Sequence, residues 1–170
     1  NCSNDIKGFV FIAYYLPMRQ SEIMNLTWDE IDFKNGFIRL GGDRTKNKSG
    51  RVVPLHPEVI AFLMSLPRPI RGGYVFEKRW CNRRAYYKAV EAAKLSDFTF
   101  HDLRHCAINN LRLAGNDHFV IKQASGHKTD KVFERYNLVT EAEMKGIKWY
   151  EEKGGDFGTM DTYMDTKAKP

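Results

Sequence analysis

Residues 32–55 change the periodicity of the chain, and this change limits the folds that it can adopt. Asn35-Gly36 is a pair typical of hairpin turns, and a segment of alternating character follows it. A second polar turn at 47–50 leads into a strand expected over 51–54. The sequence on either side has helical spacing instead. The pattern predicts an α+β fold that is mainly α, with one small antiparallel sheet.

The helical segments are bounded by residues that favour the start or the end of a helix. Pro17 ends the first segment, and Pro57 stands in the first turn of another. Asn82 and Thr99 are good N-caps, and Gly126 is a good terminator. A short strand is expected at 74–76. The expected helices cover residues 5–16, 19–28, 57–66, 82–95, 100–114, 117–125, 129–138 and 140–151.

The charge of the chain is unevenly distributed. The 170 residues carry a net charge of +6, which divides into +8 for residues 1–140 and −2 for residues 141–170. A basic body suits a polyanionic partner, although a solvated basic surface explains the same composition. We therefore treat charge alone as compatible with nucleic-acid binding rather than as evidence for it.

Composition and termini also predict where the protein works and how it is divided. The three cysteines are widely spaced, which predicts neither a disulfide framework nor a thiolate zinc site and fits a reducing, cytoplasmic environment. No apolar run reaches membrane length, and no signal peptide is visible. We expect one domain over residues 1–151 and a mobile tail over 152–170. The abrupt helical start suggests a fragment of a longer protein.

The helix expected over 100–114 has two chemically different faces. His101, Arg104 and His105 share a polar side near the helix N-terminus, which favours an anion. Taken alone, a solvated polar face explains this trio more simply. The apolar stripe, expected to face the core, consists of Leu103, Ala107, Leu111 and Ala114.

A wider set of residues suits attack on a phosphodiester without a metal. Two guanidinium forks can hold the non-bridging oxygens as negative charge develops. A tyrosine, with a reference pKa of about 10, needs a base or a cationic site to become a nucleophile. Histidines can transfer that proton, and a lysine can protonate the leaving oxygen. The residues available for these tasks are Arg19, Lys46, His101, Arg104, His127 and Tyr136. Each of them, taken singly, has an ordinary structural explanation.

Four segments within residues 5–150 resemble the catalytic domain of the tyrosine recombinases, which include phage-type integrases and Xer-like enzymes. They are MRQSEIMNLTWDEID, TKNKSGRVVPL, HDLRH and GHKTDKVFERY. The resemblance implies a helical catalytic domain with a small antiparallel sheet, of the type that breaks and rejoins DNA. It also implies a site-specific recombinase of a phage or mobile element that needs no metal or other cofactor.

The resemblance assigns a role to each of the six residues. Arg19 and Arg104 would bind the scissile phosphate, and His127 would donate a hydrogen bond to it. His101 would be the general base toward Tyr136, the nucleophile. In the family the general-acid lysine stands eight residues before the hairpin proline, which favours Lys46 over its neighbour Lys48.

The resemblance further implies double-stranded DNA as substrate, a homotetramer on paired sites and possible accessory DNA-bending proteins. A family core-binding domain would precede this fragment, the protein would associate with the nucleoid, and residues 152–170 would either dock on a neighbour or stay disordered. Three alternatives stay open. They are a type IB topoisomerase, a non-catalytic DNA-binding module, and a metallohydrolase using His101 and His105, although the last lacks the glutamate of an HExxH helix.

Overall fold

The computed structural model describes residues 3–42, 50–70, 72–76, 82–127 and 144–146. Its contacts divide the chain into two units, Asn1–Asn137 and Leu138–Pro170. Only residues 144–146 of the second unit are described, and residues 144 and 145 are helical. The helices predicted over 129–138 and over most of 140–151 lie outside the described residues.

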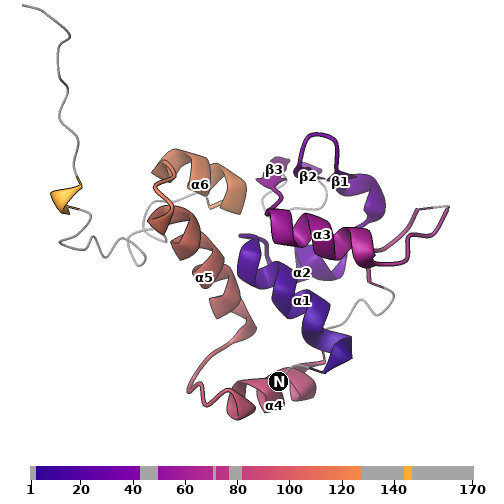
Figure 1. Cartoon of the computed structure of the whole chain (residues 1–170), viewed down its shortest axis with the longest axis horizontal. Coiled ribbons are helices and arrows are strands. Elements are labelled where there is room, and N and C mark those ends of the chain that lie inside the picture. The colour runs from indigo at the N-terminus through magenta and orange to yellow at the C-terminus, as the bar shows by residue number, and fades with distance from the viewer. Residues whose placement is uncertain (1–2, 43–49, 71, 77–81, 128–143, 147–170) are drawn as a thin grey trace, which may run out of the picture. The chain divides into compact units, whose positions relative to one another are not determined.

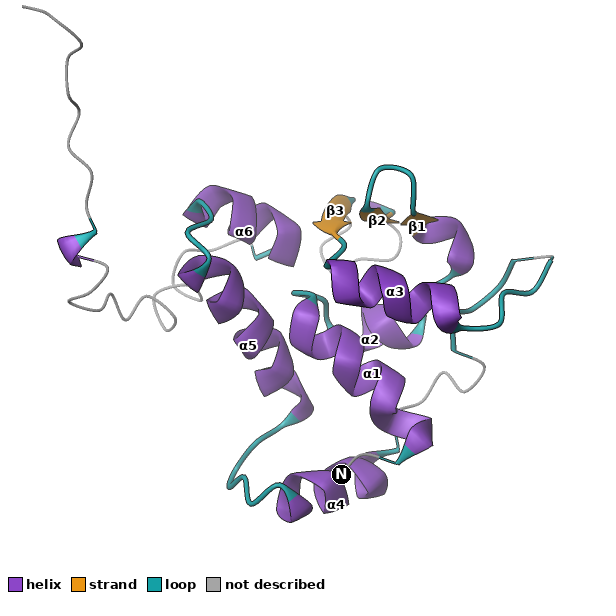
Figure 2. Ribbon diagram, viewed as in Figure 1, coloured by secondary structure: helices purple, strands orange, loops and turns teal. Residues whose placement is uncertain are grey.

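The first unit is mainly helical, with one small sheet (Figures 1 and 2). This confirms the predicted fold class. Its elements, in chain order, are α1 (Asn4–Tyr15), α2 (Gln20–Met24), the 3-10 helix η1 (Trp28–Glu30), β1 (Ile31–Asp32), β2 (Phe37–Leu40), β3 (Arg51–Pro54), α3 (Pro57–Ser65), α4 (Arg83–Ala92), α5 (Phe100–Leu113) and α6 (His118–Ser125).

The sheet is antiparallel with strand order β1-β2-β3. Ile38 on β2 pairs with Ile31 on β1 and with Val53 on β3. Ile38 and Val53 are fully buried, whereas their strand neighbours Arg39 and Val52 are exposed. The period of two expected for a half-buried strand is therefore present on both β2 and β3.

Helix α1 forms the centre of the hydrophobic core and contacts α2, α3 and α5. Ile6, Phe9, Ile12 and Leu16 on or next to it are almost completely buried. A second, smaller cluster joins α5 to α6 through Ile108 and Ile121. The core thus fixes α2 and α5 against α1, while α6 packs against both α5 and β3. No helix in the part of the chain that the structure describes is long and apolar enough to cross a bilayer.

The helix predicted over residues 19–28 is shorter than expected. Helix α2 ends at Met24, and Thr27 adopts an extended conformation with φ −109° and ψ 155°. Thr27 and Glu30 form a capping box that starts η1 instead, because the Glu30 carboxylate accepts from both the Thr27 backbone N–H and its hydroxyl. The strand predicted at 74–76 is reduced to one bridge, between Thr27 and Tyr74.

The apolar stripe predicted on α5 is only partly correct. Leu103 and Ala107 are buried and Leu111 is half-buried, but Ala114 is exposed. The reason is that α5 ends at Leu113, so that Ala114 is its C-cap rather than a member of the helical face. The stripe therefore ends at Leu111 rather than at Ala114.

Candidate active site

Arg19 is fixed at the N-terminus of α2 by its own backbone. It is the N-cap residue, and its backbone N–H donates to Glu22 Oε2 at 2.6 Å. Its side chain also bonds this carboxylate, with Nη1 to Oε1 at 3.0 Å, while Nη2 donates to the carbonyl oxygen of Gly126 at 3.1 Å. A guanidinium has five N–H donors, so this one keeps donors for a further ligand after these two bonds.

A capping box starts α5 and places His101 and Arg104 in its first turns. The carboxylate of Asp102 accepts from the Thr99 backbone N–H at 2.7 Å and from the Thr99 hydroxyl at 2.6 Å. The predicted N-cap at Thr99 is therefore confirmed. His101 is exposed, as the sequence suggested, but Arg104 is only 2% exposed, so the polar side of this helix is not uniformly solvated.

The end of α6 explains why Arg104 is buried. Asp117 caps the start of this helix, and Gly126 ends it in the left-handed conformation with φ 70°. The last carbonyl oxygens of a helix lack partners within it and carry partial negative charge. Arg104 Nη2 donates to one of these, the Ser125 carbonyl oxygen, at 2.6 Å.

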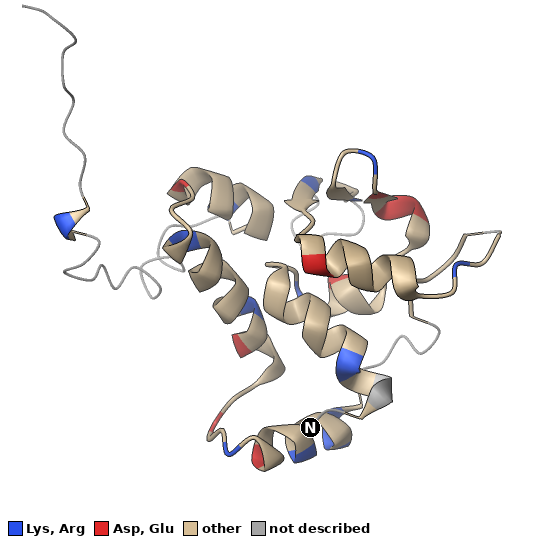
Figure 3. Ribbon diagram, viewed as in Figure 1, with Lys and Arg blue, Asp and Glu red and all other residues tan. Residues whose placement is uncertain are grey.

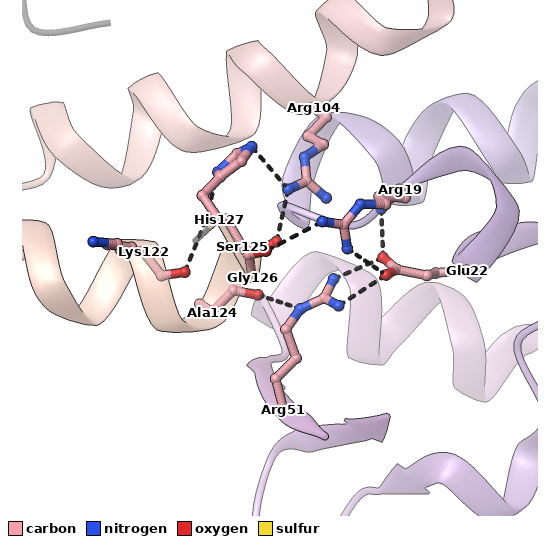
Figure 4. A network of polar contacts seen from close by, with 9 residues as sticks. All are labelled: Arg19, Glu22, Arg51, Arg104, Lys122, Ala124, Ser125, Gly126 and His127. Atoms are coloured by element: carbon pink, nitrogen blue, oxygen red, sulfur yellow. Dashed lines mark hydrogen bonds and ion pairs between the residues drawn. The ribbon is translucent and has the colours of Figure 1, made fainter. Parts of the chain in front are cut away.

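Three consecutive carbonyl oxygens at this helix end each accept from a different arginine (Figure 4). The Ala124 oxygen accepts from Arg51 Nε at 3.0 Å, the Ser125 oxygen from Arg104, and the Gly126 oxygen from Arg19. These arginines come from β3, α5 and the start of α2. One helix terminus therefore gathers cationic groups from three separate elements.

His127 follows directly and contacts Arg104. Ser125 Oγ donates to the Lys122 carbonyl oxygen at 3.1 Å and lies 2.9 Å from His127 Nδ1. A hydroxyl has one hydrogen, so Nδ1 is the donor in the second contact, which leaves Nε2 to accept from Arg104 Nη2 at 3.2 Å. These contacts fit a neutral ring protonated on Nδ1.

The charge state of His127 agrees with this hydrogen-bonding pattern. Burial, together with the positive charges of Arg104 and Arg19 and the nearby rings of His105 and His101, lowers the pKa of His127 to about 4. The ring is consequently neutral over the physiological pH range.

The positive charges of Arg104 and Arg19 also affect the pKa of His101. Although the residue is exposed, partial desolvation of its ring is the largest cause of its lowered pKa; the Arg104 charge lowers the pKa further, Asp102 opposes the change, and Arg19 adds a smaller decrease. A neutral imidazole with a lowered pKa can accept a proton near neutrality. His101 also lines a cavity of about 490 Å³ between α2, α4 and α5, whose other lining residues include Arg83, Tyr87 and Phe100.

The structure brings four of the six predicted site residues together, namely Arg19, His101, Arg104 and His127. Lys46 and its rival Lys48 lie outside the described residues, as does Tyr136. His101 and His105 stack edge to face with ring centroids 4.5 Å apart. Among residues of known position, however, no group of three or more His, Cys, Asp or Glu side chains could hold a metal ion.

Sequence reasoning missed three members of the site: Glu22, Arg51 and Ser125. Glu22 is 3% exposed, and its carboxylate accepts from both Arg19 and Arg51. Burial raises the pKa of Glu22, but the hydrogen bonds and charge of Arg51 and the bonds from Arg19 outweigh burial and lower it. Strand parity could have found Arg51, because it shares a face with the buried Val53 two positions later.

Comparison with known proteins identifies the family of this chain. A family model described as the phage integrase family matches residues 2–143. The shufflon-specific DNA recombinase of Escherichia coli is 32% identical over 126 residues, covering 74% of this chain and 32% of that protein. The integrase of Salmonella phage P22 is 26% identical over 152 residues, covering 79% of this chain and 39% of that protein. The chain thus spans less than two fifths of the length of each of these two relatives.

A solved structure supports the same assignment over most of its own length. The catalytic domain of bacteriophage HP1 integrase superposes with a TM-score of 0.66 and 25% sequence identity, covering 86% of this chain and 82% of that one. Sequence, fold and family model agree over the region that contains Arg19, His101, Arg104 and His127. The chain belongs to the phage integrase family.

Proposed function

We propose that this chain is the catalytic part of a site-specific DNA recombinase that cuts and rejoins DNA through a 3′-phosphotyrosyl intermediate. The observation that carries the proposal is the pair of guanidinium groups, Arg19 and Arg104, held side by side at the end of α6 with two neutral histidines near them. A phosphodiester becomes more negative as it turns five-coordinate, and such a cationic site stabilises that state most.

Each chemical step of the proposal has a residue to perform it. The phenolic oxygen of Tyr136 forms a bond to phosphorus, and the bond from phosphorus to the 5′-oxygen breaks. His101 accepts the phenol proton, and Lys46 gives a proton to the leaving oxygen. The reverse attack by a 5′-hydroxyl from a second strand releases the tyrosine and completes the exchange. Because the protein–DNA ester conserves the bond energy, the proposed reaction needs no nucleotide cofactor.

The role expected for His127 needs a refinement. In the contacts described above, its Nε2 accepts from Arg104 and so cannot donate to a phosphate. We propose that His127 holds Arg104 before substrate arrives, and that donation to the phosphate requires the other tautomer of the ring. Ser125 Oγ would allow that change, because its hydroxyl can donate to His127 Nδ1 instead of accepting from it.

The relatives support DNA as the substrate. They are named as a shufflon-specific DNA recombinase and as integrases, and the solved relatives include Tn1549 transposon integrase in complex with circular intermediate DNA. We accordingly propose double-stranded DNA as the partner, a homotetramer on paired sites in the longer protein, accessory DNA-bending proteins, and a nucleoid location. We also propose residues 1–151 as the catalytic domain, with 152–170 as a tail.

The decisive experiment traps the covalent intermediate. The 170-residue chain is incubated with a duplex that carries a nick close to the cleavage position, so that the short released strand diffuses away and the adduct accumulates. Wild type should give a protein–DNA band that resists denaturant, and Tyr136→Phe should give none. Absence of the band with wild type, or its persistence with Tyr136→Phe, would refute the proposed chemistry.

A second experiment separates recombination from the type IB topoisomerase alternative. The longer parent protein is given two copies of its site on one supercoiled circle. Recombination produces products in which the segment between the sites is deleted or inverted. A topoisomerase relaxes the circle but leaves the order of the segments unchanged.

A further inference from the structure

We infer that Arg51 is a positioning residue for the proposed DNA cleavage: it neutralises the Glu22 carboxylate and so keeps the charge of Arg19 available for the scissile phosphate. The inference rests on the proposed function. Arg51 stands at the first position of β3, and its side chain is 5% exposed. Its described bonds go to the Ala124 carbonyl oxygen and to the Glu22 carboxylate (Figure 4).

Arg51 holds Glu22 more completely than Arg19 does. Arg51 Nη1 donates to Glu22 Oε1 at 2.8 Å and Nη2 donates to Oε2 at 2.6 Å, which makes a bidentate pair. The Arg19 side chain makes a single bond to this carboxylate, at 3.0 Å. Bidentate, charge-assisted bonds are the strongest that an arginine forms with a carboxylate. Arg51 is therefore the principal counter-ion of Glu22.

The charges explain why a second arginine matters. The charges of Glu22 and Arg19 alone would sum to zero at the place where a phosphate must bind. Adding Arg51 makes the local sum of the three side chains +1. The lowered pKa of Glu22 agrees that the carboxylate stays ionised within this group. Arg19 can then keep its backbone anchor on Glu22 without losing its attraction for an anion.

Arg51 also fixes the backbone to which the other arginines bind. Its Nε donates to the Ala124 carbonyl oxygen, next to the carbonyls that hold Arg104 and Arg19. It packs so closely on Gly126 that a Cβ there would lie 2.9 Å from Arg51 Cδ and 3.1 Å from Nε. One side chain thus links β3, α2 and the end of α6.

A purely structural role is the alternative explanation, and the test must distinguish the two. A buried ion pair often adds little net stability compared with a well-packed apolar pair, whereas removing one partner leaves an unpaired buried charge. If Arg51 only stabilises the fold, its loss should slow cleavage in proportion to unfolding and regardless of the charge on the substrate. If it acts through Arg19, the defect should depend on that charge and on Glu22.

The experiment measures the rate of adduct formation by the folded 170-residue chain on two nicked duplexes. One has the ordinary phosphodiester at the cleavage position, and the other has a neutral methylphosphonate there. Arg51→Met should slow the reaction on the phosphodiester by roughly tenfold, less than the 10²–10³ typical of a lost direct contact. On the methylphosphonate, which lacks the non-bridging charge that Arg19 would hold, the loss should be less than about threefold.

Two further variants complete the design. Glu22→Gln/Arg51→Met removes both the carboxylate charge and its counter-ion, so it should fold and recover most of the lost rate. Arg39→Met is the matched control, because Arg39 lies on the adjacent strand β2 in an exposed ion pair with Asp32 at 3.0 Å and should behave like wild type.

Each outcome decides the question. Equal losses on both duplexes, or a double variant no faster than Arg51→Met, would overturn the inference even though wild type cleaves. If Arg51→Met does not fold, the double variant still decides: the ratio of its rates on the phosphodiester and on the methylphosphonate should stay within about threefold of the wild-type ratio, and a larger fall in that ratio would overturn the inference. Absence of any adduct with wild type would instead overturn the proposed function, and the inference with it.

Discussion

At the scale of single residues, Gly126 determines how closely Arg51 can approach the end of α6. Its φ of +70° and the 2.9 Å separation between a built Cβ and Arg51 Cδ are two separate obstacles to any side chain. Gly126→Ala should therefore lose more stability than the roughly 1–2 kcal/mol of left-handed strain alone. Gly115 is the matched control, since its φ is +81° but nothing lies within 4 Å of its Cβ position. Urea unfolding of both alanine variants checks this, and equal losses would contradict it.

Ser125 determines which nitrogen of His127 carries the proton. The fully buried hydroxyl joins the Lys122 carbonyl oxygen to His127 Nδ1. Ser125→Ala should destabilise the domain by about 1–2 kcal/mol and slow adduct formation, because the ring that contacts Arg104 loses its fixed tautomer. Ser65→Ala removes an exposed hydroxyl bonded to the Phe62 carbonyl and should change the adduct rate little. A Ser125→Ala variant with the wild-type rate would show that Ser125 does not contribute to the reaction.

The pKa of His101 predicts a pH profile for cleavage. A general base must be unprotonated, so the rate should fall as pH drops through the pKa of His101. Burial and Arg104 lower that pKa from its ordinary value of 6.5, which places the acid limb below pH 6.5. The pKa of His127, about 4, lies lower still. Single-turnover adduct rates between pH 5 and 8 test this, with His101→Asn expected to lack the limb. A midpoint above 6.5 would argue against His101 as the base.

At the scale of elements, the capping box of α5 connects stability with the position of two site residues. The Thr99 backbone N–H and hydroxyl both donate to Asp102, at the start of the helix that carries His101 and Arg104. Thr99→Ala should cost about 1 kcal/mol and also lower the adduct rate, because the first turn carries His101. Thr27→Ala breaks the comparable box of η1 and should reduce stability without a matching change in rate. Thermal melting and adduct assays on the two variants separate these effects.

The sequence predicted elements well where one residue determines a boundary. Thr99, Asn82 and Gly126 cap helices as expected, because each satisfies or releases backbone groups within a few residues of itself. It failed for α2, where the side chains of Glu22 and Glu30 each start a separate turn. The sequence also failed to predict that Arg104 is buried. The residues that contact its side chain, Ser125 and His127, are more than twenty residues away in sequence.

At the scale of the whole molecule, the family could be predicted from the sequence, but the contacts among the site residues could not. Short motifs in the sequence were enough to identify Arg19, His101, Arg104 and His127, and the family model matches the region that contains them. Nothing in a motif states that three arginines meet at one helix end or that Glu22 has two partners. Those facts depend on the packing of α6 against both β3 and α5.

The distribution of charge leads to the last prediction, which concerns DNA binding. Basic residues are concentrated on α4 (Figure 3), and Arg83, Arg84 and Lys88 on this helix are exposed. Arg83 lines the same cavity as His101, so a strand whose phosphate reaches His101 passes close to α4. Each phosphate contact releases counter-ions and adds about −0.9 to the slope of log K against log salt concentration.

Replacing Arg83 and Arg84 by glutamine should therefore weaken binding at low salt and make that slope shallower by about 2. Lys34 is another exposed cation, in the turn between β1 and β2, and it does not line the cavity, so Lys34→Gln should leave the slope unchanged. Fluorescence anisotropy with a labelled duplex, titrated between low and moderate salt, measures both. An unchanged slope for the Arg83→Gln/Arg84→Gln variant would show that DNA approaches His101 from a direction other than α4.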